Sequence, residues 1–318
     1  MKRCVYVLVA VFLCSSVELF SQTIIDTVTV GQKPTGVVVN SKNNRFFVSN
    51  KTDRTVSVID GVSDQILGVM NTTNPPTDIA INAVKNEVWV CESDASGNIF
   101  AEVFDGNTFA LLKTLRAGVG EGRIAVHPHL NRVYVGNDSS TSLTIIDGAR
   151  KKLLTNLNLS CSPFGVTVNT LTERVYVGTK GCAAGSVYVI DATNNTLLTT
   201  IPTTGVSMNY AAVDQNHNRL YLTDDVTGLY SIDGASNTII GQVTGLNKAH
   251  GVASVPSTQK AVEADSGSNR MKVINGNIPN VGGSKAVGHT PVAVAVNGVT
   301  RRIYVVNQGD NTVTVMSY

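Results

Sequence analysis

The sequence predicts an all-β fold, a seven-bladed β-propeller built from four-stranded antiparallel blades. The first observation is a repeat in which an apolar run, a polar tip and a second apolar run ending in Asp follow one another, as in 132-RVYVGNDSSTSLTIIDG-148. The second is its spacing. Successive central residues of the first run lie 42, 45, 42, 45, 41 and 42 positions apart, which is the length of one propeller blade. These residues are Phe47, Trp89, Tyr134, Tyr176, Tyr221, Val262 and Tyr304. The third is that no helical periodicity accompanies the repeat.

Each repeat supplies four strands, of which the second and third form the hairpin just described. A short apolar run before the hairpin predicts the first strand, and a run after it predicts the fourth. Runs that are apolar on both sides of the pleat fit sheets packed between neighbouring blades. We expect first strands at 36–40, 78–82, 123–127, 165–169, 211–214, 251–255 and 292–297, and fourth strands at 66–69, 110–115, 153–157, 196–201 and 238–243. In the sixth repeat the fourth-strand region, 275–288, is Gly-rich, so we expect that blade to be the least regular.

The last repeat ends at Tyr318, directly after its third strand. Its missing fourth strand is expected at the other end of the chain, because 23-TIIDTVTV-30 is similar to 196-TLLTTI-201 and 238-TIIGQV-243. An N-terminal strand in that place closes the ring and leaves no unpaired edge between blades. We therefore expect residues 23–318 to form a single propeller domain.

Residues 1–22 have the pattern of a secretory signal peptide. Lys2 and Arg3 precede the apolar run 5–13, which is too short to span a bilayer, and small polar residues lead to an expected cleavage near Ser21. A lipid-attachment site at Cys14 fits less well, because bulky Phe12 and Leu13 precede that cysteine. No other apolar stretch has transmembrane length, so we expect a secreted, periplasmic or cell-surface protein that is soluble after cleavage.

Composition excludes several classes of partner. The chain has 318 residues with a formal net charge of +2 and no Lys/Arg run, so we expect no nucleic-acid partner. It has few His residues and no C-x-x-C-H haem-attachment motif, so we expect no cofactor and disfavour an electron-transfer role. We expect a monomer that recognises a protein, a glycan or a small molecule.

Three cysteines follow the leader. Cys161 and Cys182 belong to one repeat, in two connections that emerge on the same face of a blade. In an exported chain this placement predicts a disulfide, although two separate exposed thiols are the alternative. Cys91 ends the second strand of the second repeat and is expected to be a buried free thiol.

Three motifs that resemble chemical sites have simpler structural interpretations. The repeated Asp60, Asp105, Asp147, Asp191 and Asp233 are expected to accept backbone N–H groups in tight turns. The segment 118-GVGEGR-123 lacks the following helix of a phosphate-binding loop and is expected to be a flexible connection. The His127-Pro128-His129 spacing suits a metal, but no further ligands accompany it, so no metal site is expected.

The strongest candidates for ligand binding share the face that carries the fourth-to-first and second-to-third connections, here called the loop-rich face. We select Asp78, Arg123, His250 and His289 because they hold similar places at the start of first strands, and the two His residues are expected to be neighbours at the channel mouth. Solvated polar loops explain the same residues without chemistry. The other polar residues that we expect on this face are Glu92, Asp94, Asn137, Asp138, Asp224, Asp225, Asp265 and Asp310.

The strand motif 134-YVGN-137, with 47-FVSN-50 and 304-YVVN-307, resembles the YVTN family of β-propeller repeat proteins over residues 23–318. The resemblance implies a seven-bladed fold related to that of lactonases, and a secreted or surface role. Our leading hypothesis is an exported, non-catalytic binding scaffold. The alternative is a lactonase-type hydrolase in which His250, His289 and Arg123 converge at the channel mouth.

Overall fold

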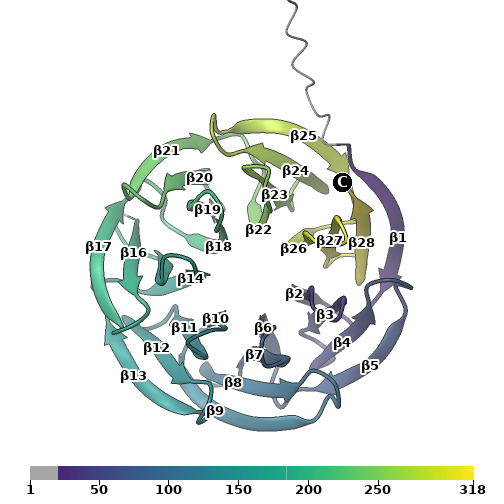
Figure 1. Cartoon of the computed structure of the whole chain (residues 1–318), viewed down its shortest axis with the longest axis horizontal. Coiled ribbons are helices and arrows are strands. Elements are labelled where there is room, and N and C mark those ends of the chain that lie inside the picture. Colours follow the sequence, from purple (N-terminus) through teal and green to yellow (C-terminus); the bar gives the residue numbers. More distant parts are fainter. Residues whose placement is uncertain (1–20, 184) are drawn as a thin grey trace, which may run out of the picture.

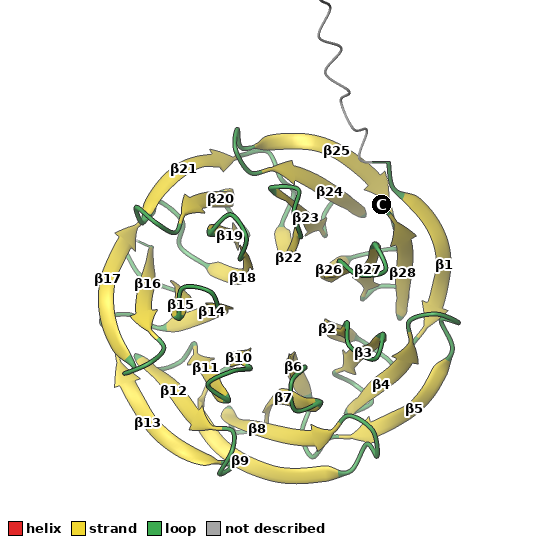
Figure 2. Ribbon diagram, in the orientation of Figure 1, coloured by secondary structure: helices red, strands yellow, loops and turns green. Residues whose placement is uncertain are grey.

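The computed structural model describes residues 21–183 and 185–318. These residues form seven four-stranded antiparallel sheets arranged as a ring around a central channel, and none of them is helical (Figures 1 and 2). The prediction of an all-β, seven-bladed propeller is therefore confirmed. The search for a helix long and apolar enough to cross a membrane finds none in this part of the chain. Of the predicted signal peptide, only Ser21 and Gln22 lie inside the described residues.

The strands follow the chain in blade order. Blade one contains β2 (Pro34–Asn40), β3 (Arg45–Asn50), β4 (Thr55–Asp60) and β5 (Ile66–Asn71), and blade two contains β6 (Pro76–Asn82), β7 (Glu87–Ser93), β8 (Asn98–Asp105) and β9 (Leu111–Val119). Blade three contains β10 (Gly122–His127), β11 (Arg132–Asn137), β12 (Ser142–Asp147) and β13 (Lys152–Asn158), and blade four contains β14 (Pro163–Asn169), β15 (Arg174–Thr179), β16 (Ser186–Asp191) and β17 (Thr196–Pro202). Blade five contains β18 (Met208–Asp214), β19 (Arg219–Asp224), β20 (Gly228–Asp233) and β21 (Thr238–Val243), and blade six contains β22 (Ala249–Val255), β23 (Lys260–Asp265), β24 (Arg270–Asn275) and β25 (Asn280–Ala286). Blade seven contains β26 (Pro291–Asn297), β27 (Arg302–Asn307), β28 (Thr312–Ser317) and, as its outer strand, β1 (Thr23–Thr29).

The two ends of the chain close the ring. β1 pairs antiparallel with β28, from Thr23 opposite Ser317 to Thr29 opposite Thr312. Figure 1 shows β1 running along the outside of β28 at the point where the C-terminus lies. The predicted N-terminal closing strand is confirmed.

The recurring aromatic residue of the second strand, present in six of the seven blades, packs between blades. Trp89, Tyr134, Tyr176, Tyr221 and Tyr304 are fully buried. The ring of Phe46 in blade one stacks on that of Tyr304 in blade seven, with centroids 4.3 Å apart. Both faces of the middle strands are thus covered by neighbouring blades, which explains why these strands read as continuous apolar runs.

The arginine that opens many second strands bonds to the next blade. Nη1 of Arg45 donates to the carbonyl of Gly106 at 3.0 Å, and Nη1 of Arg174 donates to the carbonyl of Gly234 at 3.2 Å. The acceptor lies directly after the Asp that ends the third strand of the neighbouring blade. These hydrogen bonds fix the angle between adjacent blades, so this part of the repeat is architectural.

The repeated aspartates act as predicted. Oδ1 of Asp60 accepts the N–H groups of Val62 and Ser63 at 2.9 Å, and Oδ1 of Asp105 accepts those of Asn107 and Thr108 at 2.8 Å. These backbone donors lower the pKa of both carboxyls. The turn role of this series is therefore confirmed.

The asparagine that ends the second strand is buried and ties this strand to the third. Nδ2 of Asn137 donates to the hydroxyl of Thr144 at 3.0 Å, and Nδ2 of Asn307 donates to that of Thr314 at 2.8 Å. Asn50 makes the same contact with Ser57 at 3.0 Å. The asparagine that ends the YVTN-like motif is thus a structural hydrogen-bonding residue inside the blade.

Blade six is more regular than the sequence indicated. β25 pairs with β24 along its length, with one shift of register between Val273 and Ile274. The corresponding shift occurs in other blades, for example between Ile145 and Ile146. β25 is largely exposed, as is the outer strand β13 of blade three, so the glycines of β25 cost the blade little packing.

The cysteines have distinct environments. Cys161 and Cys182 form a disulfide with their Cα atoms 6.2 Å apart, joining two connections on the loop-rich face of blade four. Cys91 is a buried free thiol.

Candidate ligand-binding site at the channel mouth

The innermost strands of the seven blades line the channel, and the residue at one equivalent position near their start differs between blades in a systematic way. It is the third residue of the strand in six blades and the second in β10. Four blades carry a residue no larger than Ala, and three carry a large polar side chain. The residues at this position, in blade order, are Gly36, Asp78, Arg123, Gly165, Tyr210, Gly251 and Ala293. Asp78 lies opposite Cys91 on the next strand and Tyr210 lies opposite Thr223, the same register as Ala293 opposite Val306. Small residues thus leave the channel open at four blades, and large polar side chains enter it from the other three.

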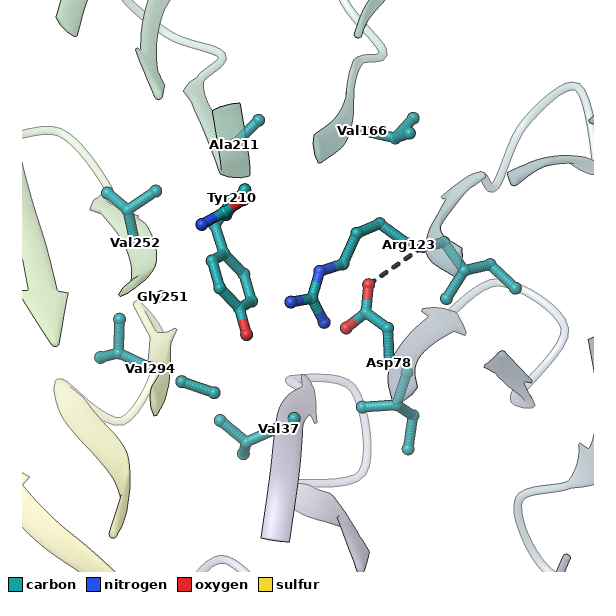
Figure 3. Close-up of a pocket in the computed structure, with 14 residues that line it drawn as sticks. Val37, Asp78, Arg123, Val166, Tyr210, Ala211, Gly251, Val252 and Val294 are labelled. Atoms are coloured by element: carbon teal, nitrogen blue, oxygen red, sulfur yellow. Dashed lines mark hydrogen bonds between the residues drawn. The ribbon is translucent and has the colours of Figure 1, made fainter. Parts of the chain in front are cut away.

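The three large side chains surround a cavity of about 140 Å³ in the channel. Figure 3 shows the carboxylate of Asp78, the guanidinium of Arg123 and the ring of Tyr210 pointing into this cavity from three different strands. The wall of the cavity also includes four valines, Val37, Val166, Val252 and Val294. A few polar groups on an apolar wall is the usual composition of a small-molecule site.

Arg123 is held in a defined position. Its Nη1 donates to the carbonyl of Thr77 at 2.9 Å. Its Cζ lies 4.2 Å from the ring centroid of Tyr210 and 4.9 Å from that of Phe164, within the range of cation–π attraction. Its Nε is buried and has no hydrogen-bond partner among the described residues.

Asp78 lies beside Arg123, but its hydrogen bond goes elsewhere. Oδ2 accepts the N–H of Ile124 at 3.0 Å. Burial raises the pKa of this carboxyl, and the charge of Arg123 opposes the shift only in part. Both side chains lie deep in the molecule while part of their surface faces the channel.

On the loop-rich side of Arg123 the channel widens into a mouth chamber of about 200 Å³. Lys51 in its wall pairs with Glu121, with Nζ 2.9 Å from Oε1. His250 lies 4.0 Å from Asp225 through Nε2, and its Nδ1 is buried without a hydrogen-bond partner in the described part of the chain. Burial is the main cause of the lowered pKa of His250, so its ring is neutral at pH 7. The chamber is lined by Lys33, Thr35, Lys51, Thr77, Glu121, Arg123, Tyr210, His250, Val292 and Gln308.

A wider bowl of about 800 Å³ adjoins the chamber over the tips of blades one to four. Lys51 and Glu121 line both spaces. Farther out, Nζ of Lys180 lies 2.7 Å from Oδ2 of Asp138 and 4.3 Å from the ring centroid of Phe164. The charges of the bowl largely neutralise one another in pairs.

The structure places the four predicted site residues unequally. Asp78, Arg123 and His250 line the channel or its mouth. The side chain of His289 is 74% exposed, and its Nδ1 lies 2.8 Å from Oδ1 of Asp310 in the neighbouring tip. His289 lies in the loop before β26 and is not part of the wall of either described space.

The other polar residues expected on the loop-rich face have varied roles. Asp94 lines the bowl and accepts the N–H of Asn98 at 2.8 Å. Asp224 is buried and accepts the N–H groups of Val206 and Ser207 at 2.8 and 2.7 Å. Asp265 is buried and pairs with Lys272. Most of these side chains therefore hold loops in place.

The His127-Pro128-His129 segment belongs to a turn. Nδ1 of His127 accepts the N–H of Leu130 at 3.2 Å, and its Nε2 lies 2.9 Å from Oε2 of Glu173. His129 is exposed. No group of three or more His, Cys, Asp and Glu able to hold a metal ion occurs in residues 21–183 and 185–318.

The glycine-rich segment 118–123 is a tight connection between two strands. β9 ends at Val119 and β10 begins at Gly122, so two residues separate them. Gly120 has a φ of 106°, a backbone conformation that favours glycine, and its N–H donates to the carbonyl of Gly97 at 2.7 Å. No helix follows to hold a phosphate, and four of the six residues belong to the two strands, so only Gly120 and Glu121 form the connection.

Sequence reasoning missed Tyr210 and Phe164, which both lie within cation–π distance of Arg123. It also missed a buried acidic pair in blade two. Glu92 and Glu102, both fully buried, occupy the places that Asn137 and Thr144 hold in blade three. Glu92 accepts the N–H of Asn74 at 2.8 Å, and Glu102 accepts the hydroxyl of Thr73 at 2.6 Å. Burial, together with the nearby Glu102, raises the pKa of Glu92 to about 9. Aligning the repeats position by position would have revealed both features.

The arrangement suits binding better than hydrolysis. Cys91 lies behind Asp78, and burial raises the pKa of its thiol to about 12, so it carries no nucleophilic thiolate near pH 7. The lactonase-type alternative needed His250, His289 and Arg123 at one point, and His289 lies elsewhere. That alternative is not favoured.

Comparison with solved structures gives the fold alone. The chain is similar to a hydrazine synthase of Kuenenia stuttgartiensis, with a TM-score of 0.81, 14% sequence identity, and coverage of 92% of this chain and 97% of that chain. No family model matches the sequence, and no curated protein matches it. The YVTN family is therefore not confirmed, while the seven-bladed β-propeller fold is shown both by the strand topology and by this structural neighbour.

Proposed function

We propose that this protein is an exported, non-catalytic β-propeller that binds a small polar ligand at the channel mouth on its loop-rich face. The observation that carries the proposal is the variation at this equivalent position of the inner strands. Four blades place Gly or Ala there, whereas Asp78, Arg123 and Tyr210 converge on one cavity from the other three. A ring that only had to close could use small residues in all seven places.

The available space supports a small ligand. The channel cavity and the mouth chamber measure about 140 and 200 Å³. For comparison, an engineered cavity of about 150 Å³ holds one benzene molecule. A protein or glycan chain would contact the wider bowl but could insert only a terminal group into the mouth.

Two observations support export. The first 22 residues have the basic, apolar and small-residue order of a signal peptide. The disulfide between Cys161 and Cys182 fits an oxidising compartment.

The lack of a complete catalytic set supports a binding role. His250 is neutral at pH 7 and faces no serine or thiolate nucleophile in the mouth chamber described here. The reaction named for the hydrazine synthase is not transferred to this chain, because a shared fold at 14% identity carries no chemistry.

A ligand screen tests the proposal. A library of small polar molecules would be screened by saturation-transfer NMR against the wild-type protein, Tyr210→Ala, and Arg116→Ala as a matched control on the outer strand β9. We expect hits whose signal is lost in Tyr210→Ala and kept in Arg116→Ala. Hits that are indifferent to Tyr210, or a folded wild-type protein that yields none, would refute binding at the mouth.

A further inference from the structure

The guanidinium of Arg123 has an unused hydrogen-bonding edge. Nη1 is engaged by the carbonyl of Thr77, and the guanidinium lies near the rings of Tyr210 and Phe164. Nε is buried and lacks a hydrogen-bond partner among the described residues. A buried donor without a partner is costly, and the terminal Nη1–Nη2 edge of a guanidinium is one of the two edges that bind a carboxylate through parallel hydrogen bonds.

The nearest carboxylates do not supply the missing partner. Asp78 accepts the N–H of Ile124, and no ion pair joins it directly to Arg123 in the described structure. Glu121 is bonded to Lys51 at 2.9 Å. Arg123 is therefore fixed by backbone and aromatic contacts instead of by an acidic side chain.

The mouth chamber has an excess of positive charge. Its lining includes Arg123, Lys33 and Lys51, against the single carboxylate of Glu121. The ion pair between Lys51 and Glu121 leaves the charges of Arg123 and Lys33 facing the space. An anion entering the chamber would meet a favourable potential inside a partly desolvated wall.

We propose that the ligand of the mouth chamber is a small carboxylate held by the fork of Arg123, with Tyr210 and Phe164 holding the guanidinium in place by cation–π contact. This inference rests on the proposed function, because it names the chemical class that the same site takes. A planar carboxylate matches one planar fork. A tetrahedral phosphate needs donors around several oxygens, and of the two lysines in the chamber wall Lys51 is already paired with Glu121. The chamber volume of about 200 Å³ limits the ligand to a molecule of roughly benzene size or slightly larger.

Calorimetric titration with defined probes tests the class. Acetate, benzoate and succinate would be compared with acetamide, benzamide, inorganic phosphate and sulfate. We expect at least one carboxylate to bind, its amide not to bind, and phosphate and sulfate to bind more weakly. Arg123→Lys keeps the charge but loses the fork, and we expect roughly a 30-fold loss of affinity or more, since a hydrogen bond to a charged group contributes about 2 kcal/mol. Arg116→Lys, on an outer strand, should leave affinity unchanged.

A measurement on the unmodified protein covers the case in which Arg123→Lys fails to fold. The ¹⁵Nε–H resonance of Arg123 should shift on addition of the binding carboxylate, while those of exposed arginines should not. An unshifted resonance at saturating carboxylate would overturn the inference.

Other outcomes distinguish a failure of the carboxylate inference from a failure of the proposed binding function. Tighter binding of phosphate than of any carboxylate would overturn the carboxylate class. Amides that bind as well as their acids, with dependence on Tyr210, would also overturn it and leave the mouth as a ligand site. A ligand screen in which no hit depends on Tyr210 would refute both proposals.

Discussion

The buried acidic pair of blade two makes stability depend on pH in a way that one substitution should remove. Glu92 and Glu102 are both fully buried and replace the amide–hydroxyl pair seen in blade three. One of the two carboxyls must keep its proton, because two neighbouring charges without a cation are strongly unfavourable in a buried site. Glu92→Gln is nearly isosteric, stays neutral at every pH, and can still accept the N–H of Asn74.

The size of the effect follows from the raised pKa of Glu92, which is about 9 in the folded protein against an ordinary value of 4.5. Above pH 4.5 the unfolded chain loses this proton while the folded chain retains it, so the free energy of unfolding falls as pH rises until about pH 9. The slope is about 1.4 kcal/mol per pH unit, which amounts to about 3 kcal/mol between pH 5 and pH 7. We therefore expect Glu92→Gln to match the wild type below pH 4.5 and to exceed it by about 3 kcal/mol at pH 7.

Urea unfolding of both proteins at a series of pH values from 4 to 8, followed by circular dichroism, measures this difference. Other groups also titrate in this range. The pKa of Glu263 is raised by burial, and that of His127 is lowered chiefly by burial, but both are present in both proteins and cancel in the comparison. Asp26→Asn, at an exposed position of β1, serves as the control. Parallel stability curves for the wild type and Glu92→Gln would refute the reasoning.

Three further predictions concern the scaffold. Replacing Cys161 and Cys182 by Ser should lower stability by about 3 kcal/mol, since the disulfide closes a loop with a sequence separation of 21, and reduction of the wild type should match the variant in a thermal melt. Deleting residues 21–29 removes β1 and exposes the edge of β28, so we expect self-association by size-exclusion chromatography; a monomer that still unfolds in one sharp transition would contradict the role of this strand. Asp147→Ala should destabilise by about 1 kcal/mol near pH 7, because Oδ1 of Asp147 accepts the N–H of Arg150 at 2.9 Å. Backbone and side-chain bonds to Arg150 lower the pKa of Asp147, so its stabilising effect should vanish as pH falls below about 3.8, and a mutant deficit that persists at pH 2 would argue against this.

The ring and its closure could be predicted because each blade repeats the same local demands. Tyr134 must be large and apolar to fill the space between blades, and Asp147 must accept backbone donors in a turn. Both requirements recur at a fixed spacing, the aromatic residue in six of the seven repeats and the Asp in five. The closing strand followed from the same pattern, because the last blade lacked a partner that residues 23–30 could supply.

The site could be predicted only in part because it depends on strand register near the channel. The sequence placed the first strands of blades four and five at 165–169 and 211–214, where the apolar runs begin. The strands start earlier, at Pro163 and Met208, so both Phe164 and Tyr210 lie inside them, and Tyr210 belongs to the channel wall. Backbone pairing with the next strand, such as that of Met208 with Asp224, sets where these strands start. The pattern of side chains in the sequence does not indicate this pairing.

The same register explains the contrast between the two histidines. His250 is the second residue of β22 and therefore lines the mouth, whereas His289 lies two positions before β26 begins. The position of a histidine relative to the start of the strand therefore decides whether its side chain lines the channel mouth or lies in an exposed loop. In the sequence both histidines stand shortly before an apolar run, so their different surroundings became visible only with the pairing.

The energetics of the inner strands favour a function for the three large side chains. A Cβ on Gly165 would lie 2.7 Å from the carbonyl oxygen of Met208, so the small residue there is a steric requirement of close blade packing. Arg123, by contrast, brings a charge into the interior without a direct acidic partner, and Asp78 has a pKa raised by the same burial. Both features reduce the stability of the folded ring relative to a channel lined by Gly and Ala, as four of the blades have it. A ligand whose carboxylate pairs with the guanidinium would recover part of that free energy, so its binding should raise the melting temperature of the wild type and leave that of Arg123→Lys nearly unchanged.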